Sequence, residues 1–395
     1  MKKANSQQTK VHNRLLILKT IYNNARISRA DIARVTGLNR ATVSDAVAEL
    51  MKDGVVAEVG IGSSAAGKPP ILLSMVDDAR YLIGVDLAES EFRGAVINLR
   101  GKIIHRLNLA INGRDGDAAL ASVYSLLDKL IPLAEGPILG IGIGTPGLIN
   151  TRQRIVRNAV NLDWHDLPLG DLLDERYKMP VHIANDSQAA ALAEFTFGDS
   201  KNISNLIVIN IGRGTGAGIV LNRQLYYGDS FGAGEFGHVA IVENGERCRC
   251  GHYGCLETVT SSQAIVRSAR AIAKNDLHSK LYRLVASPEE INMDIVSQAF
   301  EAGDDAIRTL ITEVGRYLGF AAAILVGILN VNRIVLAGRV ARFGQALLEP
   351  IKQEIKRRSL PGLADETVVE ITTLGPDIVI LGAAALLLNH ELGLP

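Results

Sequence analysis

The chain contains 395 residues, of which 47% are hydrophobic and 21% are charged. This composition supports packed cores and excludes a wholly disordered protein, and the length allows more than one domain. No uninterrupted apolar run reaches the ~20 residues of a membrane-spanning helix, and the polar N-terminus does not resemble a secretory signal, so we expect no membrane insertion. Three cysteines, an odd number, argue against a disulfide framework and for the cytoplasm.

The net charge is zero, but the charged residues are unevenly distributed along the chain. Residues 1–75 hold 11 Lys and Arg against 5 Asp and Glu, whereas the remaining 320 residues hold 31 basic and 37 acidic residues. A small basic head joined to a larger acidic body is typical of a polyanion-binding module attached to a second unit.

The basic head shows the pattern of a winged helix-turn-helix. Apolar residues spaced three or four apart predict a first helix over 11–22. Ser28 is a capping residue for a second helix that breaks at Gly37, and Asn39 caps a third helix that breaks at Gly54. Two helices joined by a short glycine-containing turn form the helix-turn-helix unit. Two β-prone stretches around a loop of small residues then predict the wing.

A recognition helix presents polar residues of its first turns to base edges in the major groove. The start of the third helix, the second helix and the wing all supply candidates. The predicted DNA-binding residues are Arg29, Asn39, Arg40, Thr42, Ser44 and Lys68. Lys68 lies in the predicted wing, which can meet a phosphate or the minor groove. The alternative is a three-helix domain for protein contacts, but the basic charge, the polar face and the wing together favour DNA.

The acidic body alternates strands with helices, which indicates an α/β fold. Strand-turn-strand patterns begin at Tyr81 and again at Leu206, and they suggest two related lobes with a cleft between them. The strand ILGIGIGTPG is followed by a segment that we expect to be irregular. Near the C-terminus, the pattern predicts a long helix over 309–329 and a final helix over about 382–392.

Six motifs resemble, in this order, the ROK family of repressors, open reading frames and sugar kinases: GLNRATVS, GKPP, GIGTPG, ANDSQAAALAE, GAGEFGHV and CRCGHYGCLE. The resemblance covers nearly the whole chain and is closest to the sugar-responsive repressors of the xylose and N-acetylglucosamine type. It implies an actin-like, two-lobed body of the hexokinase and RNase H kind. We expect the winged helix-turn-helix over 1–75, lobe 1 over 76–190 with a C-terminal helix within 372–395, and lobe 2 over 191–371 with a zinc-binding loop.

All three cysteines lie within eight residues of one another, and His238 lies ten residues before the first of them. Three thiolates and one imidazole form a closed tetrahedral Zn²⁺ site of the structural type. The predicted ligands are His238, Cys248, Cys250 and Cys255, and the family resemblance implies the same four. His252 is a competing imidazole, and buried free thiols are the alternative to a metal site. Because four protein ligands leave no open position, we expect zinc to fix the loop before Glu257 rather than to catalyse a reaction.

Polar residues around the cysteine cluster are candidates for a sugar site. Carboxylates accept hydrogen bonds from hydroxyl groups, and an asparagine both donates and accepts them. If one ring nitrogen of His238 binds zinc, the other nitrogen is oriented as a donor. The family resemblance places five residues around a monosaccharide: Asn185, Asp186, Glu235, His238 and Glu257. Each acidic residue alone is more simply a solvated surface group, so this prediction depends on the matched motifs.

In the kinases that the chain resembles, Asp186 would be the general base of phosphoryl transfer. The first hairpin of those kinases reads D-x-G-G-T, and its glycines let backbone amides close around phosphates. Here the hairpin reads Asp86-Leu87-Ala88-Glu89-Ser90, so side chains replace both glycines and Glu89 adds negative charge. The turn Ala337-Gly338-Arg339 also lacks an expected run of glycines, although the second hairpin at 212–216 remains glycine-rich. We therefore expect ATP chemistry to be lost and Asp186 to be a vestigial base.

The sequence favours a sugar-responsive transcriptional regulator, a repressor of carbohydrate-utilisation genes, over an ATP-dependent sugar kinase that carries a DNA-binding head. Because one winged head reads one half-site, we expect a palindromic operator and a homo-oligomer, either a dimer or a tetramer. A third hypothesis is that the body docks a sugar-transport protein. The sequence leaves open which monosaccharide is the effector and whether it releases DNA or promotes its binding.

Overall fold

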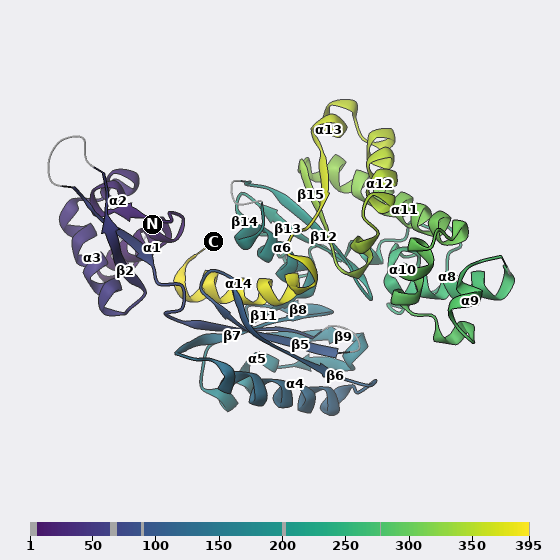
Figure 1. Ribbon diagram of the computed structural model, residues 1–395, viewed down its shortest axis with the longest axis horizontal. Coiled ribbons are helices and arrows are strands. Elements are labelled where there is room, and N and C mark those ends of the chain that lie inside the picture. Colours follow the sequence, from purple (N-terminus) through teal and green to yellow (C-terminus); the bar gives the residue numbers. More distant parts are fainter. Residues whose placement is uncertain (1–5, 64–68, 88–90, 200–202, 277, 395) are drawn as a thin grey trace.

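The computed structural model describes the whole chain except residues 1–5, 64–68, 88–90, 200–202, 277 and 395. A small head, drawn in purple in Figure 1, lies beside a larger body in which two mixed sheets are covered by helices. The predicted combination of a helix-turn-helix head and an α/β body is confirmed.

Three helices and a three-stranded sheet form the head: α1 (Ser6–Tyr22), α2 (Arg29–Thr36), α3 (Arg40–Lys52), β1 (Ile27–Ser28), β2 (Val56–Ile61) and β3 (Ile71–Met75). The antiparallel pairing of β2 with β3 confirms the predicted wing. The side chain of Ser28 accepts a hydrogen bond from the amide of Asp31 at 3.1 Å, and that of Asn39 accepts one from the amide of Thr42 at 2.8 Å, so both predicted caps are confirmed. Helix α1 begins before the predicted residue 11, because its polar first turn adds no apolar periodicity.

The body contains two five-stranded sheets with the same order of strands. Lobe 1 has the order β11-β7-β4-β5-β6. Read from the corresponding edge, lobe 2 has the order β16-β15-β12-β13-β14. In each sheet three successive antiparallel strands are extended by two parallel strands. The lobe 1 strands are β4 (Tyr81–Asp86), β5 (Glu91–Asn98), β6 (Ile103–Ala110), β7 (Ile138–Thr145) and β11 (Val181–Asn185). The lobe 2 strands are β12 (Leu206–Ile211), β13 (Thr215–Leu221), β14 (Gln224–Leu225), β15 (Arg333–Ala337) and β16 (Val368–Ile371). This repetition confirms the two related lobes.

Helices cover both faces of the lobe 1 sheet. Helices α4 (Gly116–Leu130) and α5 (Leu169–Tyr177) lie on one face, and α14 (Ile378–Leu392) lies on the other (Figure 1). Helix α6 (Asp186–Phe197) packs against α14 and also against β12 and β13 of lobe 2. The predicted boundary between residues 190 and 191 falls inside this continuous helix, so the limits of the two lobes remain a prediction.

The other helices belong to the lobe 2 side: α7 (Glu257–Thr260), α8 (Ser262–Asn275), α9 (Leu281–Leu284), α10 (Met293–Glu301), α11 (Asp305–Leu329), α12 (Gln345–Arg358) and α13 (Pro361–Glu366). Both α11 and α14 begin one turn before the predicted residues, 309 and 382. The start of α11 is capped by the side chain of Asp304, which accepts a hydrogen bond from the amide of Ile307 at 3.0 Å.

The segment predicted to be irregular is instead a small antiparallel sheet. It consists of β8 (Leu148–Asn150), β9 (Ile155–Ala159) and β10 (Trp164–Leu167). These strands of three to five residues are too short to show a clear alternation of apolar and polar side chains. Trp164 is buried, and its ring nitrogen donates to the carbonyl of Gly116 at 2.9 Å, so this side chain packs in the core of lobe 1.

Close backbone contacts fix α14 against lobe 1 and α6. A Cβ on Gly142 of β7 would lie 1.9 Å from the carbonyl oxygen of Ala383, and a Cβ on Gly382 would lie 1.8 Å from that of Ala189. Only glycine permits these approaches. Residues at the start of α14 also line the cleft described below. The wall of the cleft is therefore held in place by the packing of α14.

Within the described residues, α11 is the one helix that is long and apolar enough to cross a membrane by length and composition. Half of its most apolar window is buried inside the protein. Its buried side chains, such as Leu318, Ala322 and Val326, belong to the core of lobe 2. A core helix of a globular protein also meets these two criteria.

Polar contacts hold the head against lobe 1. The guanidinium of Arg100 donates to the carbonyl of Tyr22 at 2.5 Å and lies 4.5 Å from the centre of the Tyr22 ring. It also donates to the carboxylate of Asp77 at 3.0 Å. Arg80 donates to the carbonyl of Asp53 at the end of α3 at 3.0 Å. The head is therefore attached to the body by side-chain contacts as well as by the chain.

Candidate functional site

A cavity of about 1030 Å³ opens between the two lobes. Its lining includes the end of β11, the hairpin between β12 and β13, and the start of α14. Ligand clefts in α/β proteins commonly lie at the carboxyl ends of the strands. This volume is at the upper end of the roughly 300–1,000 Å³ typical of small-molecule sites, so the cavity can hold a monosaccharide and more.

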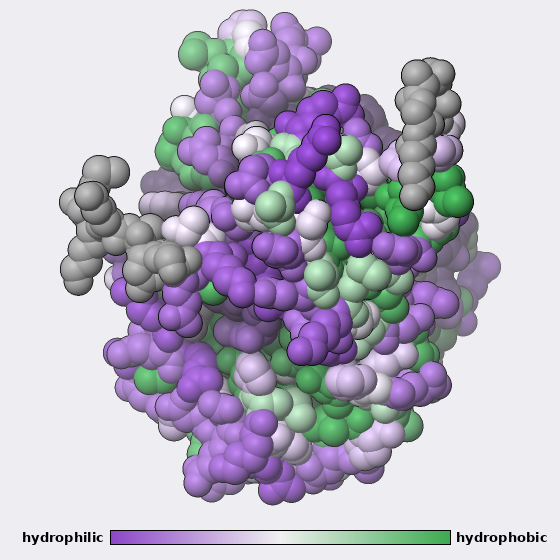
Figure 2. Space-filling view, turned by 90° about the vertical axis from the view of Figure 1, so that its left-hand side faces the viewer, coloured by the Kyte–Doolittle hydropathy of each residue, from purple (hydrophilic) through white to green (hydrophobic). Residues whose placement is uncertain are grey.

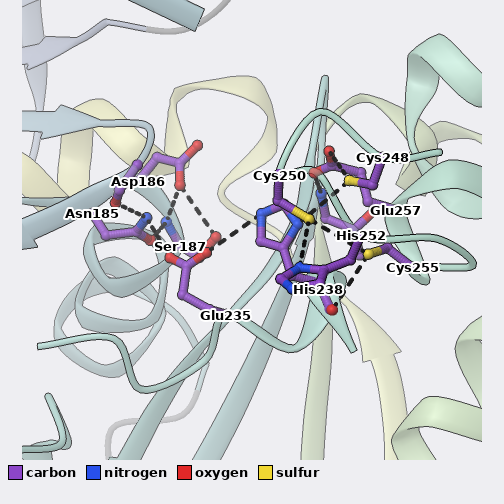
Figure 3. A network of polar contacts seen from close by, with 12 residues as sticks. Asn185, Asp186, Ser187, Glu235, His238, Cys248, Cys250, His252, Cys255 and Glu257 are labelled. Atoms are coloured by element: carbon purple, nitrogen blue, oxygen red, sulfur yellow. Dashed lines mark hydrogen bonds and ion pairs between the residues drawn. The ribbon is translucent and has the colours of Figure 1, made fainter. Parts of the chain in front are cut away.

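Asn185 and Asp186 reach the cavity because they mark the junction of β11 and α6. The side-chain oxygen of Asn185 caps α6 by accepting from the amide of Ser187 at 2.8 Å. Its amide group donates to the carbonyl of Gly147 at 2.9 Å and to the carboxylate of Glu235 at 3.4 Å. These contacts orient the side chain of Asn185 toward the same space as Glu235 (Figure 3).

Asp186 lies among other carboxyl groups in the cleft. Burial raises its pKa from 3.8 to about 7, and the nearby charges of Asp86 and Glu235 add to this shift. Burial also raises the pKa of Glu235; His238 opposes this effect and Glu257 supports it. A cluster of acids with raised pKa values is typical of a ligand or catalytic site, because a purely structural carboxylate is usually paired or solvated.

Glu257 connects the loop after the cysteines to the second hairpin. Its carboxylate accepts a hydrogen bond from the amide of Thr215 at 3.1 Å. The other carboxylate oxygen lies 3.9 Å from the sulfur of Cys248. All five predicted sugar-binding residues, Asn185, Asp186, Glu235, His238 and Glu257, line the cavity.

The four predicted metal ligands converge. The donor atoms of His238, Cys248, Cys250 and Cys255 all lie within 4.8 Å of one another. The Cys250 and Cys255 sulfurs are 3.6 Å apart, and the Cys248 sulfur is 3.6 Å from Nδ1 of His238. Tetrahedral zinc with bonds of about 2.3 Å requires donor separations of roughly 3.8 Å, so this set of donors fits the ion.

The two ring nitrogens of His238 face different groups. Nδ1 faces the thiol of Cys248, and Nε2 lies 3.8 Å from the carboxylate of Glu235. His238 therefore joins the cysteine cluster to the acidic residues of the cleft, as Figure 3 shows. His252 also contacts the cluster, since its Nδ1 lies 3.6 Å from the sulfur of Cys250.

The head presents the polar start of α3 to solvent. Arg40 and Ser44 are exposed and Thr42 is half-buried, while Val43 and Val47 face the core. Hydrophilic residues predominate on the side of the molecule that carries the head (Figure 2).

The remaining candidates in the head differ in their environment. The side chain of Asn39 is occupied by its cap. Arg29 forms a 3.1 Å ion pair with Glu58 of β2, and its side chain is 32% exposed, so part of the guanidinium stays accessible to solvent. Lys68 lies outside the described residues.

The part of the cleft lined by the first hairpin contains an arginine that the sequence analysis missed. Arg93 on β5 lies directly opposite Asp86 on β4, and its guanidinium forms an ion pair with the buried carboxylate of Asp86. The register of the predicted hairpin was the signal that could have identified this pair. Ala88, Glu89 and Ser90 lie outside the described residues, so the expected effect of these side chains on nucleotide binding remains a prediction.

Comparison with known proteins covers both parts of the chain. Residues 82–390 match the ROK family, and residues 12–57 match a winged helix-turn-helix DNA-binding family. The xylose repressor of Caldicellulosiruptor bescii is 34% identical over 388 residues, which is 97% of each chain.

Two solved structures are similar to this fold. A ROK family transcriptional regulator homologous to the Escherichia coli Mlc protein has a TM-score of 0.85 and 29% identity, and the match covers 98% of both chains. A ROK glucokinase from Streptomyces griseus, in complex with glucose and AMPPNP, has a TM-score of 0.72 and 28% identity. That match covers 78% of this chain and 98% of the kinase.

Proposed function

The chain belongs to the ROK family, and we propose that it is a sugar-responsive DNA-binding regulator that represses carbohydrate-utilisation genes. The observation that carries this proposal is the combination, in one chain, of an exposed recognition helix and a cleft lined with hydroxyl-binding side chains. Similarity to the xylose repressor extends over 97% of the chain, whereas similarity to the glucokinase structure covers 78%. This difference supports a regulator over a metabolic kinase.

We assign monosaccharide binding to Asn185, Asp186, Glu235, His238 and Glu257. The hydroxyl groups of a pyranose both donate and accept hydrogen bonds. The carboxylates of this set can accept hydrogen bonds from them, and the amide and imidazole groups can donate hydrogen bonds to them. The convergence of these side chains on one cavity supports the assignment. The similar glucokinase binds glucose in its crystal structure, and the similar repressor is a xylose repressor, so xylose is the sugar to test first and glucose the second.

We propose that Zn²⁺ is held by His238, Cys248, Cys250 and Cys255 and has a structural role. When bound, the ion would fix the 238–257 loop and supply no catalysis, because four protein ligands complete its tetrahedral shell. The loop itself positions the carboxylate of Glu257 against the hairpin at Thr215. Folding of the loop is thereby linked to the shape of the sugar site.

The route from the cleft to the head passes through α14. The start of this helix lines the cleft, and Leu394, just after its end, is buried in a cluster that includes side chains of the head. A sugar that binds one lobe arrangement better than another would shift the population of arrangements and move α14. Because each head reads one half-site, a homo-oligomer with two heads and a palindromic operator are required. We place this activity in the cytoplasm, where operator DNA and reduced thiols are found.

The test is operator binding by the full chain with and without sugars. A fluorescein-labelled palindromic fragment from the chain's own promoter region is titrated in the presence of xylose, glucose or N-acetylglucosamine. We expect one of these sugars to change operator affinity at least tenfold. Specific DNA binding that no monosaccharide alters would contradict the sensing role, and absence of specific binding would contradict regulation itself.

A sugar kinase is the second candidate, since Asp186 lies in the cleft and the glucokinase is a structural neighbour. Coupled release of ADP in the presence of the same sugars and MgATP tests it. We expect no release above the rate of the Asp186→Asn variant. Sugar-dependent turnover that this substitution removes would establish the kinase instead.

A further inference from the structure

A side-chain hydrogen bond joins the two lobes across the cleft. The guanidinium of Arg249 donates to the side-chain oxygen of Asn161 at 2.6 Å. Arg249 lies in the 238–257 loop on the lobe 2 side, and Asn161 lies in the short 3-10 helix η2 (Val160–Leu162) between β9 and β10 of lobe 1. Both residues line the cavity. Neither the proposed sugar contacts nor the proposed metal ligands include this pair, so its role is still to be explained.

Asn161 is held in place from within lobe 1. Its neighbours Leu162 and Trp164 are buried and belong to the core of that lobe. Asp163, between them, has a φ of 50°, a left-handed conformation that aspartate tolerates better than most residues. The backbone that carries Asn161 is therefore anchored on the side that follows it, and the residue is not part of a free loop.

Arg249 is held in place from the opposite side of the cleft. The amide of Cys248 donates to the carbonyl of His252 at 2.7 Å, and the amide of Gly251 donates to the carbonyl of Cys248 at 3.0 Å. Arg249 thus lies inside a tight turn, and Cys248 and Cys250 on either side of it both belong to the convergent cluster. Two anchored segments therefore present a donor and an acceptor to each other across the cavity.

This bond connects the two walls that carry the proposed sugar contacts. On lobe 1, Asn185 donates to the carbonyl of Gly147 at 2.9 Å, and a Cβ on Gly147 would lie 2.2 Å from the carbonyl oxygen of Asn158. The wall beside Asn185 is therefore continuous with residues 158–161. On the other wall, the 238–257 loop carries two more of the five proposed contacts at its two ends.

A bond between opposite walls limits how far the walls separate. The cavity of about 1030 Å³ can hold more than a monosaccharide, so its volume alone does not restrict the ligand to one sugar ring. A hydrogen bond from a charged guanidinium is stronger than one between neutral groups. Because Arg249 is exposed, the bond can open and close while both lobes stay folded.

We propose that Arg249 and Asn161 are specificity-determining residues whose bond, called the latch here, closes the two walls over a single monosaccharide and excludes sugars extended by a second ring. This inference rests on the proposed function, in which the cavity binds a monosaccharide. A bound monosaccharide leaves the latch closed, whereas a disaccharide holds the walls apart and loses the bond. Selectivity is a difference between two affinities, and the latch adds only to that of the smaller ligand.

The first test detects the latch without any sugar, by hydrogen-exchange mass spectrometry of the full chain. Arg249→Ala should speed amide exchange about threefold or more in residues 155–167 of lobe 1 as well as in the 238–257 loop, because the two segments open together. Arg247→Ala, at an exposed arginine of the same loop, is the matched control and should leave residues 155–167 unchanged. An effect of Arg249→Ala that is confined to its own loop would overturn the latch.

The second test measures size selectivity by calorimetry with two pairs of sugars, xylose with xylobiose and glucose with cellobiose. The wild type should prefer the monosaccharide of at least one pair, and Asn161→Ala should lower this preference about tenfold. Asn161→Asp replaces the amide by a carboxylate that pairs with Arg249 more strongly, so this variant should keep or increase the preference. An Asn161→Ala variant with the wild-type preference would overturn the specificity role.

The two tests separate failure of the latch from failure of the proposed function. A wild type that binds the monosaccharide and whose preference does not depend on Asn161 would contradict the latch alone. A wild type that binds none of the four sugars would contradict the proposed sugar site, and with it any role of the pair in sugar specificity. Exchange that is coupled across the cleft and a preference that falls in Asn161→Ala but not in Asn161→Asp would together support the latch.

Discussion

Asp186 shows how position alone changes the properties of a residue. The end of β11 places it in a cleft that also contains Asp86 and Glu235, and burial together with these charges raises its pKa to about 7. The folded protein therefore binds a proton more tightly at this site than the unfolded chain, whose aspartates titrate near 3.9. Ionisation of Asp186 costs stability as the pH rises from about 4 to 7.

The first prediction concerns the pH dependence of sugar binding. Because the ionised carboxylate is the better acceptor for sugar hydroxyls, the affinity for the effector should fall as the pH drops below about 7, by up to tenfold per pH unit. Calorimetry of the full chain at pH 6, 7 and 8 measures this. An affinity that is constant across this range would show that Asp186 does not contact the sugar as a carboxylate.

The second prediction concerns Asp186→Asn. An amide cannot ionise, so this variant of the empty protein should be more stable at pH 7.5, on the order of 1 kcal/mol or more. It should also lose most of its sugar affinity. Thermal unfolding with and without sugar measures both effects, with Asp171→Asn, at an exposed carboxylate of α5, as the control. A variant that binds sugar normally would remove Asp186 from the site.

At the scale of elements, the functional side chains lie at the starts of helices and in the 238–257 loop. The caps at Ser28 and Asn39 define where α2 and α3 begin, and the cap at Asn185 does the same for α6. These short polar residues satisfy helix amides that have no partner within the helix. Asn185 combines this structural role with an amide group directed at Glu235, so the site is built into the start of the helix.

The third prediction concerns α3. Arg40→Ala should weaken operator binding about tenfold to a hundredfold, the ~1–3 kcal/mol of one side-chain contact with a base. Sugar affinity should be unchanged, because α3 lies in the head. Lys52→Ala, an exposed basic residue at the other end of α3, is the control and should have a smaller effect. Equal losses in the two variants would mean that α3 binds DNA through general charge rather than its first turns.

The fourth prediction concerns the 238–257 loop. Cys250→Ser should remove zinc and lower sugar affinity, because Glu257 loses its fixed position. His252→Ala is the matched control and should retain the metal if His238 is the fourth ligand. Plasma emission measures the zinc content per chain. We expect one zinc ion in the wild type, none in Cys250→Ser and one in His252→Ala. Zinc loss in His252→Ala would reassign the imidazole ligand.

On the scale of the whole molecule, α6 and α14 connect the two lobes and the head. α14 packs directly against glycines of β7 and against α6, and the segment after it reaches the side chains of α1. Bodies that are joined through packed helices move in discrete steps rather than by continuous deformation. In the proposed sensing mechanism, occupancy of the cleft would act on the head through this packing.

The fifth prediction tests this link at Arg100. Arg100→Ala removes the contacts with Tyr22 and Asp77. The sugar-induced change in operator affinity should shrink at least threefold, while sugar affinity itself stays constant. Arg114→Ala, an exposed residue of lobe 1, is the control. An unchanged sugar response would show that the head senses the body through other contacts.

Local patterns were sufficient to predict the helix-turn-helix, its caps, the two hairpins and the resemblance to the ROK family. They worked because capping and glycine turns depend on residues close in sequence. The short strands β8, β9 and β10 were missed because three to five residues carry little periodicity. The ion pair between Arg93 and Asp86 was missed because it depends on strand register rather than on motif spacing.

The amino-acid sequence by itself determined the type of head, the alternation of elements in the body and the set of residues capable of binding a metal or a sugar. Tertiary structure decided which of these residues meet: Asn185 approaches Glu235, and the two nitrogens of His238 face a thiol and a carboxylate. It also decided that α11 keeps an apolar surface exposed. The reason is physical, since distances between elements and burial arise from packing of the whole chain, which no local pattern encodes.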